Sequence, residues 1–158
     1  MVPAAFAQVG SQAPRGGLPG GDLELETVVE KILEVTAADG QAQTTLVPVA
    51  TTVRGDEIVY TVIFTNVSEQ MVDSIRITNP IPAELRYLAD TAFGPGCEIL
   101  YSVDAGRTYG LPAELFVAAE DGSQRPAEAG DYTHIRWVLK APLDAGAKGF
   151  ARFRAVVR

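Results

Sequence analysis

Residues 55–66 read Gly-Asp-Glu-Ile-Val-Tyr-Thr-Val-Ile-Phe-Thr-Asn, and this stretch determines the fold class. Within it every second side chain is bulky and apolar, which is the period of a β-strand that turns one face toward a core. The side chains that share this face are Ile58, Tyr60, Val62 and Phe64. β-Branched and aromatic residues also favour extended chain. The pattern therefore predicts a strand over Glu57–Thr65.

The same alternation recurs near the C-terminus, in His134–Lys140 and Gly149–Arg158. Weaker strand patterns are present in Gln43–Val53, Val72–Thr78, Leu85–Leu88, Cys97–Val103 and Leu115–Ala118. Turn dipeptides such as Asp39-Gly40 and Asp121-Gly122 separate these segments. Short strands divided by turn signals are typical of sandwiches, so we expect an all-β, immunoglobulin-like β-sandwich of about seven to nine strands over residues 23–158.

The core of this sandwich is expected where the inward faces of its strands meet. Its expected members are Ile58, Tyr60, Val62, Phe64, Ile75, Ile77, Trp137, Leu139, Phe153 and Val157. All of them are apolar or aromatic, and burial of such side chains is the main driving force of folding.

The segment Leu23–Val35 fits two different periods. Apolar residues at odd positions alternate with glutamates at even positions, which predicts a strand. Leu25, Val28, Val29, Ile32 and Leu33 also have the spacing of one face of a helix. We favour the strand because the other segments are β, and because Asp39-Gly40 would then join this segment to Gln43–Val53 as a hairpin.

Composition limits the classes of function. The chain has 158 residues, one Cys, one His and a net charge of −7, with 47% hydrophobic residues. This length suits one domain, and the acidic balance argues against nucleic acid as the main partner. The single Cys97 excludes an internal disulfide and a zinc site built from several cysteines. The sequence contains no run of 18 apolar residues, so it predicts no transmembrane segment. Nothing in the composition indicates a cofactor.

The N-terminal residues have a composition unlike the rest. Ala5-Phe6-Ala7 followed by Gln8 fits the small-x-small rule for signal-peptidase cleavage, so residues 1–7 are interpreted as the remnant of an export signal. The alternative is an accidental Ala-rich start. Residues 8–22 contain five Gly and two Pro, which predicts a flexible arm, disordered before residue 23.

A family resemblance rests on residues 55–66 together with residues 72–87, Val-Asp-Ser-Ile-Arg-Ile-Thr-Asn-Pro-Ile-Pro-Ala-Glu-Leu-Arg-Tyr. They resemble the bacterial conserved-repeat domain of unknown function that is the eleventh in its numbered series. Its pattern is a Gly-Asp opening, a Tyr-Thr strand ending in Thr-Asn, and a second strand ending in Asp-x-Leu-Pro-x-Gly-Leu. Asn79, Ile81 and Glu84 depart from that pattern. The resemblance, tight over residues 54–88, implies an immunoglobulin-like domain of an exported, cell-surface or wall-associated bacterial protein.

Three short motifs have both a structural and a functional interpretation. Residues 102–109, Ser-Val-Asp-Ala-Gly-Arg-Thr-Tyr, resemble the Asp-box of sialidase-type propellers, which is a structural hairpin turn even there; the functional alternative is contact with calcium or a sugar. Arg54-Gly55-Asp56 spells an adhesion tripeptide but coincides with the turn that opens a strand, where Asp56 can accept backbone N–H bonds. Asn66-Val67-Ser68 matches a glycosylation acceptor, although Asn66 also suits a left-handed turn position. We expect all three to serve bends of the chain.

The residue types that most often serve as nucleophiles, bases and metal ligands are few in this chain, which has one His and one Cys. His134, the only histidine, is expected on the outward face of a strand beside Arg136, and Cys97 precedes Glu98, whose charge disfavours a reactive thiolate. No pair of carboxylates is marked as convergent. We therefore expect no catalytic, metal or cofactor residues.

The charge distribution points to an interaction surface. Residues 1–100 carry 5 basic and 13 acidic side chains, whereas residues 101–158 carry 8 basic and 7 acidic ones. The side chains expected at one edge of the sandwich are Glu24, Glu26, Glu30, Glu34, Arg136, Arg152, Arg154 and Arg158. In one interpretation the acidic and basic rows pair within the chain. In the other, Leu23–Val35 adds as a strand to a neighbouring copy.

Three functions remain open at this stage. The favoured one is a non-enzymatic exported bacterial structural or binding module of the cell envelope or extracellular space, whose partner is a protein or another copy. The second is a self-assembling filament or dimer subunit. The third is a small carbohydrate-binding or hydrolytic domain, which would require Tyr101, Tyr109 or Tyr132 to be exposed together.

Overall fold

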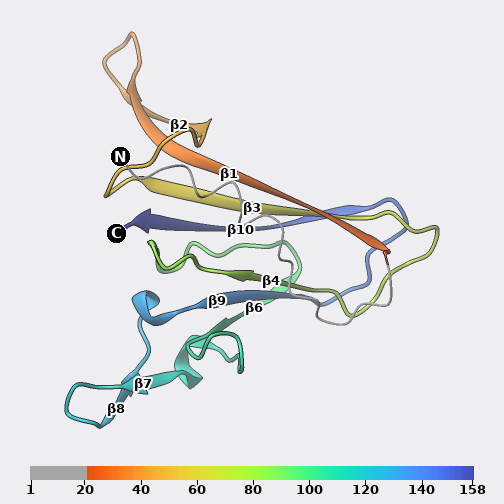
Figure 1. Cartoon of the computed structure of the whole chain (residues 1–158). Helices are drawn as coiled ribbons and strands as arrows, with labels where there is room; N and C mark the ends of the chain where they lie inside the picture. Colours follow the sequence, from red (N-terminus) through yellow and green to blue (C-terminus); the bar gives the residue numbers. More distant parts are fainter. Residues whose placement is uncertain (1–20) are drawn as a thin grey trace.

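The strand predicted over Glu57–Thr65 is present as β3 (Glu57–Asn66), at the centre of the larger of two facing sheets. The structure is a computed structural model, and it describes residues 21–158. The interpreted export remnant, residues 1–7, and nearly all of the predicted arm, residues 8–22, lie outside the described residues. Figure 1 shows the strands stacked as two layers. The described chain begins beside the end of β3, where Leu23 faces Asn66, and finishes beside its start, where Val156 faces Glu57.

The first sheet has five strands in the order β2-β1-β3-β10-β5, all antiparallel. Besides β3 these are β1 (Leu23–Thr36), β2 (Ala42–Pro48), β10 (Lys148–Val157) and β5 (Leu85–Tyr87). The second sheet has three strands in the order β4-β9-β6. They are β4 (Arg76–Pro80), β9 (His134–Leu139) and β6 (Cys97–Ser102). The two sheets make the predicted all-β sandwich.

Two further strands form a separate hairpin, β7 (Phe116–Ala118) and β8 (Gln124–Pro126). Two single 3-10 turns accompany it, η2 (Pro112–Glu114) and η3 (Ala129–Asp131). The described chain thus has ten strands, eight of them in the two sheets. The small hairpin accounts for the excess over the expected number.

Most strand predictions are confirmed, and the differences lie at strand ends. The segment Val72–Thr78 begins its strand only at Arg76, because Ser74 has a φ of 57° and interrupts the extended chain. The second strand of the first hairpin ends at Pro48 rather than Val53, and one further bond, from the Val49 N–H to the Val29 carbonyl, follows it. Strand β8 was not expected, because its three residues carry no alternation.

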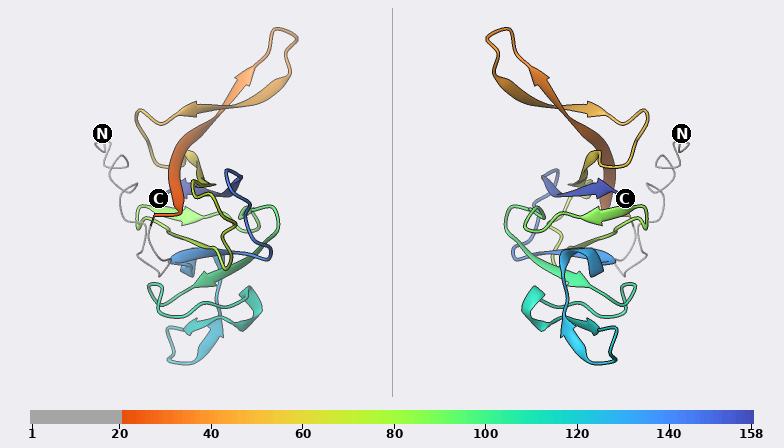
Figure 2. Two further views of the ribbon diagram at one scale, coloured as in Figure 1. Left: turned by 90° about the vertical axis from the view of Figure 1, so that its right-hand side faces the viewer. Right: turned by 90° about the vertical axis from the view of Figure 1, so that its left-hand side faces the viewer.

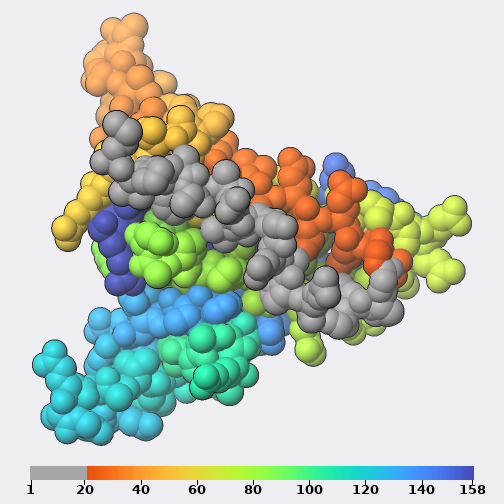
Figure 3. Space-filling view, viewed as in Figure 1, coloured from red at the N-terminus to blue at the C-terminus, as the bar shows by residue number. Residues whose placement is uncertain are grey.

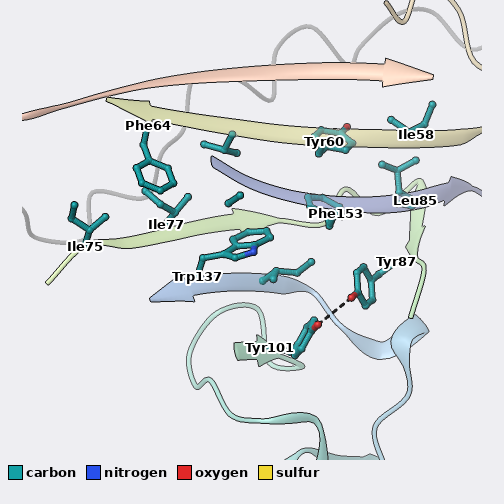
Figure 4. Close-up of a cluster of buried hydrophobic side chains, with 14 of the residues drawn as sticks. Ile58, Tyr60, Phe64, Ile75, Ile77, Leu85, Tyr87, Tyr101, Trp137 and Phe153 are labelled. Carbon is teal, nitrogen blue, oxygen red and sulfur yellow. Dashed lines mark hydrogen bonds between the residues drawn. The ribbon is translucent and has the colours of Figure 1, made fainter. Parts of the chain in front are cut away.

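The core lies between the two sheets and is rich in aromatic rings (Figure 4). The ring of Phe153 stacks on Tyr60 at a centroid distance of 5.1 Å and touches Trp137 at 6.2 Å. Nine of the ten predicted core residues are buried, while Leu139, the last residue of β9, is only partly buried. The prediction missed Tyr87 and Tyr101, whose hydroxyl groups meet at 3.0 Å.

The phenol of Tyr60 differs from that of Tyr87 in its hydrogen bonding. The hydroxyl of Tyr60 is buried and has no hydrogen-bond partner among the described residues. Burial, followed by the nearby Glu84 charge, raises the pKa of Tyr60 to about 12. The Tyr87 hydroxyl bonds to Tyr101 and also accepts the Ala92 N–H at 3.0 Å.

We therefore expect opposite results from removing these two hydroxyl groups. Tyr60→Phe should leave the free energy of unfolding unchanged or raise it by about 1 kcal/mol, because an unpaired buried hydroxyl costs free energy. Tyr87→Phe should lower it by about 1–2 kcal/mol, because it leaves the Tyr101 hydroxyl and the Ala92 N–H without this partner. Urea denaturation of both variants measures the difference. Equal losses in the two variants would contradict the interpretation.

Candidate functional site

Strand β1 is shared between the sandwich and a projecting hairpin. Residues Leu23–Lys31 pair with β3, and residues Glu30–Thr36 pair with β2. Strand β3 begins at Glu57, just beyond the last β1–β3 pair. Among the described residues, the distal half of β1 therefore pairs with β2 alone. Figures 1 and 2 show this hairpin extending away from the two sheets, and Figure 3 shows its tip standing clear of the other atoms. The strand interpretation of Leu23–Val35, with its hairpin turn, is confirmed.

The outer face of the larger sheet carries two rows of the predicted charged residues, the glutamates of β1 and the arginines of β10, and these rows are not neighbours. Glu30 on β1 and Arg154 on β10 lie opposite Val59 of β3, one on each side of it. With strands spaced about 4.8 Å apart, the two rows are about 9.6 Å from each other. The prediction that these rows pair directly is therefore wrong, because β3 separates them.

The arginines of β10 find other partners. Arg154 forms an ion pair and a hydrogen bond with Glu57 of β3, and Arg152 donates from Nε to the Thr61 hydroxyl at 3.0 Å. These contacts help to bury Val59 and Thr61, although both residues point to the outer face. The basic row therefore stabilises the middle of its own sheet.

The remaining predicted residues lie elsewhere. Arg136 belongs to the second sheet, where its Nε donates to the Thr78 hydroxyl at 3.0 Å and its guanidinium lies 3.6 Å from the Tyr109 ring centroid. Arg158 donates from Nε to the carbonyl of Leu85 at 3.0 Å. Glu34 lies on the projecting hairpin. The structure thus brings only the β1 and β10 members of the predicted set to one face.

The first residues of β1 have a sheet edge with no partner within residues 21–158. The Val67 N–H donates to the Asp22 carbonyl at 2.9 Å, and in an antiparallel pair every second residue bonds to the same neighbour. The residues that exchange backbone bonds with β3 are therefore Glu24, Glu26 and Val28. Leu23, Leu25 and Thr27 therefore direct their N–H and C=O groups away from β3. At Val29 the edge is closed by the residue that follows β2, because the Val49 N–H donates to the Val29 carbonyl. The sequence pattern indicated a strand here, but strand order alone decides which edge stays open.

The inner face of this segment is also incompletely covered. Leu25 lies opposite Phe64 and so points toward the core side of the sheet, yet 42% of it is exposed. The larger sheet has five strands and the facing sheet three, so β1 extends past its cover. This free edge and the projecting hairpin form the candidate site.

The Asp-box segment is a closed turn. Both Asp104 oxygens are occupied: they accept the Ser102 hydroxyl at 2.7 Å, the Thr108 hydroxyl at 2.6 Å and the backbone N–H groups of Arg107 and Thr108. These bonds, led by the Thr108 hydroxyl, hold the pKa of Asp104 below its usual range. Ala105 and Gly106 have positive φ, as a tight turn requires. The predicted role in a bend is confirmed.

The other two motifs are also occupied within the fold. The Asp56 carboxylate accepts the Lys31 ammonium at 2.7 Å and the Val53 N–H at 2.8 Å, so the adhesion tripeptide does not present a free acid. The Asn66 amide is fully buried and hydrogen-bonded, unlike an exposed glycosylation acceptor. The expected left-handed conformation of Asn66 is wrong, because Asn66 continues β3 and has no positive φ.

His134 and Cys97 have no arrangement that favours chemistry. Burial, followed by the Arg136 charge, lowers the pKa of His134, whose Nδ1 lies 3.1 Å from the Thr133 hydroxyl. Burial also raises the pKa of the Cys97 thiol, which is partly buried. Within residues 21–158 no cluster of His, Cys, Asp and Glu is placed to hold a metal ion.

The three tyrosines that a carbohydrate-binding surface would require are not exposed together. The ring of Tyr101 is buried and stacks on Tyr132 at 4.4 Å, while Tyr109 lies under Arg136. These rings therefore pack against the protein itself instead of forming an open platform.

Comparison with known proteins adds no assignment. No family model matches the chain, and no curated protein or solved structure is similar to it. The resemblance of residues 54–88 to a conserved-repeat domain stays a prediction. No helix within residues 21–158 is long and apolar enough to cross a membrane.

Proposed function

We propose that this chain is a non-enzymatic structural or binding module that engages a protein partner through the free edge of β1 and the projecting hairpin. The observation that carries this proposal is the hairpin itself. Every residue of β2 except Val47 is exposed, and Leu33 and Val35 of β1 are 38% and 48% exposed. Such a hairpin buries little surface against its own sandwich, so it contributes little to the stability of the fold, and a binding role explains it better.

We further propose that the protein acts in a bacterial cell envelope or extracellular space. Two features of the sequence support this location: the cleavage-like stretch Ala5-Phe6-Ala7-Gln8, and the resemblance of residues 54–88 to domains of exported bacterial proteins. Both are independent of the binding surface.

Self-association is the second candidate function. The exposed Leu33 and Val35 share one face of the hairpin, and Leu46 is exposed on the other. Two hairpins could bury these side chains against each other. The residues Leu23–Val35 are already part of their own sheet as β1, so the copies would meet through the hairpin without donating this strand.

Removal of the hairpin tests the proposal. Replacing residues 33–45 by an Asn-Gly turn should change the free energy of unfolding by less than about 1 kcal/mol, because few buried contacts are lost. A large loss of stability would show that the hairpin serves its own fold and would contradict the proposal.

A photo-crosslinking residue at Val35 locates the partner. We expect an adduct of one defined mass in the native host, and none from the same residue at Phe116, which is equally exposed on the β7–β8 hairpin. An adduct of twice the protein mass, together with concentration-dependent light scattering, would favour self-association. Equal labelling from both positions would contradict a specific site.

A further inference from the structure

We infer that the free edge of β1 at Leu23–Thr27 binds a partner segment that adds as an antiparallel strand and alternates basic with apolar side chains. This inference rests on the proposed function and names the chemistry of the partner. It follows from three features of the edge: its free backbone groups, the different character of its two faces, and the position of its glutamates.

The backbone supplies the affinity. Leu23, Leu25 and Thr27 direct N–H and C=O groups outward, and Val49, which follows β2, closes the edge at Val29. A row of this kind, without a partner among the described residues, is a template for another strand. The open part of the edge, Leu23–Thr27, is long enough for a short extended segment. On one side it ends where the β2 end of the hairpin joins β1 at Val29.

The side chains supply the selectivity. In an antiparallel pair, residues directly opposite each other lie on the same face of the sheet. A strand added here meets the exposed Leu25 on the inner face, and it meets Glu24 and Glu26 on the outer face. Neither glutamate forms an ion pair within residues 21–158. The complementary strand therefore carries an apolar residue between two basic ones.

A second copy of β1 does not meet this requirement. In a symmetric antiparallel pair of two such edges, the residues whose backbone groups point to the open edge must lie opposite one another. These residues are Leu23, Leu25 and Thr27. Each register then places a glutamate opposite a glutamate, whether it is centred on residue 24, 25 or 26. Like charges directly opposite are destabilising, and charged edges are a common protection against self-pairing. The occupant is therefore a strand of different sequence.

The same chain contains a strand with the complementary pattern. Residues 151–155 of β10 read Ala-Arg-Phe-Arg-Ala, with the arginines on the outer face and the apolar residues on the inner face. This strand lies between β3 and β5, so β10 itself is not the occupant. As a peptide, however, it would place Phe opposite Leu25 and one Arg opposite each of Glu24 and Glu26.

Fluorescence anisotropy with labelled Ala-Arg-Phe-Arg-Ala-Val tests the inference on the full chain. We expect saturable binding that weakens by about tenfold or more in the double variant Glu24→Lys/Glu26→Lys. The double variant Glu98→Lys/Glu120→Lys makes the same change of charge at two exposed positions outside the candidate site and should bind as the wild type does. The charge-reversed peptide Ala-Glu-Phe-Glu-Ala-Val should prefer Glu24→Lys/Glu26→Lys.

Three results would overturn the inference. The first is equal binding by the two double variants, which would indicate attraction by net charge alone. The second is undiminished binding of a peptide whose backbone nitrogens are methylated. The third is binding only after removal of residues 1–20, which would make this segment of the chain the occupant. If the peptide fails while the Val35 adduct persists, the inference is wrong and the proposed function stands.

Discussion

Replacing Asn66 by Asp is expected to lower the free energy of unfolding by about 3 kcal/mol or more at neutral pH. The Asn66 amide is fully buried, and its Nδ2 donates to the carbonyls of Gln70 at 2.7 Å and Leu143 at 2.9 Å. A carboxylate has no hydrogen to offer either carbonyl, so two hydrogen bonds are lost and a charge is buried beside the two carbonyl oxygens. Gln70 still accepts the Ser68 hydroxyl and Leu143 still accepts the Val72 N–H, so the buried charge is the larger part of the cost. These contacts fasten two loops to the end of β3.

The loss in Asn66→Asp should shrink on acidification. Burial and the two facing carbonyls raise the pKa of the new carboxyl, and we expect them to outweigh the two bonds that Oδ1 accepts from the Ser68 N–H and hydroxyl, which lower it. The penalty is therefore complete above the folded-state pKa and falls as pH drops through it, because the neutral acid is buried at lower cost and regains one donor. Urea denaturation at pH 7 and pH 4, each relative to the wild type, measures this difference.

Asn79→Asp is the matched control, since Asn79 is the other asparagine of the chain. Its side chain is only partly buried and donates one local bond, to the Pro80 carbonyl at 3.0 Å. The same chemical change should cost less than about 1 kcal/mol there. Equal losses at the two positions, or a loss at Asn66 that does not depend on pH, would disprove the role assigned to Asn66.

The fold class was predictable because it follows from the alternation of apolar and polar residues within single strands. Alternation at Ile58, Tyr60, Val62 and Phe64 needs only one buried face, and all four are buried. The same holds for Ile135 and Trp137 on β9. Tyr87 was missed because its strand has three residues, too few to show a period.

The interaction surface was only partly predictable, because it depends on the order of strands. The sequence showed acidic residues on one segment and arginines on another, but it contained nothing that placed β3 between them. A charge pattern identifies the faces of a strand, whereas its neighbours are decided by packing between distant parts of the chain. The open edge at Leu25 and the projecting hairpin are consequences of that order.

Replacing Gly149 by Ala is the second change with a large expected effect, and its sign is opposite to the usual one. At a position with room, Gly→Ala stabilises a protein by about 0.4–1 kcal/mol. Gly149 of β10 lies directly opposite Phe64 of β3, and a Cβ there would come within 2.3 Å of two ring carbons. The Phe64 ring is buried, so it has little space to move. We expect a loss of about 2 kcal/mol, which urea denaturation measures.

A double-mutant cycle separates this steric cause from a general intolerance of Gly149. In a Phe64→Leu background the ring is gone, so Gly149→Ala should cost clearly less than it does in the wild type. Gly130→Ala is the control, since a Cβ at Gly130 would lie 3.7 Å from the nearest atom, in the flexible Arg86 side chain, and should be close to neutral. If Gly149→Ala lowers the free energy of unfolding equally in both backgrounds, a clash with the Phe64 ring is not the cause of the loss, and the steric explanation is wrong.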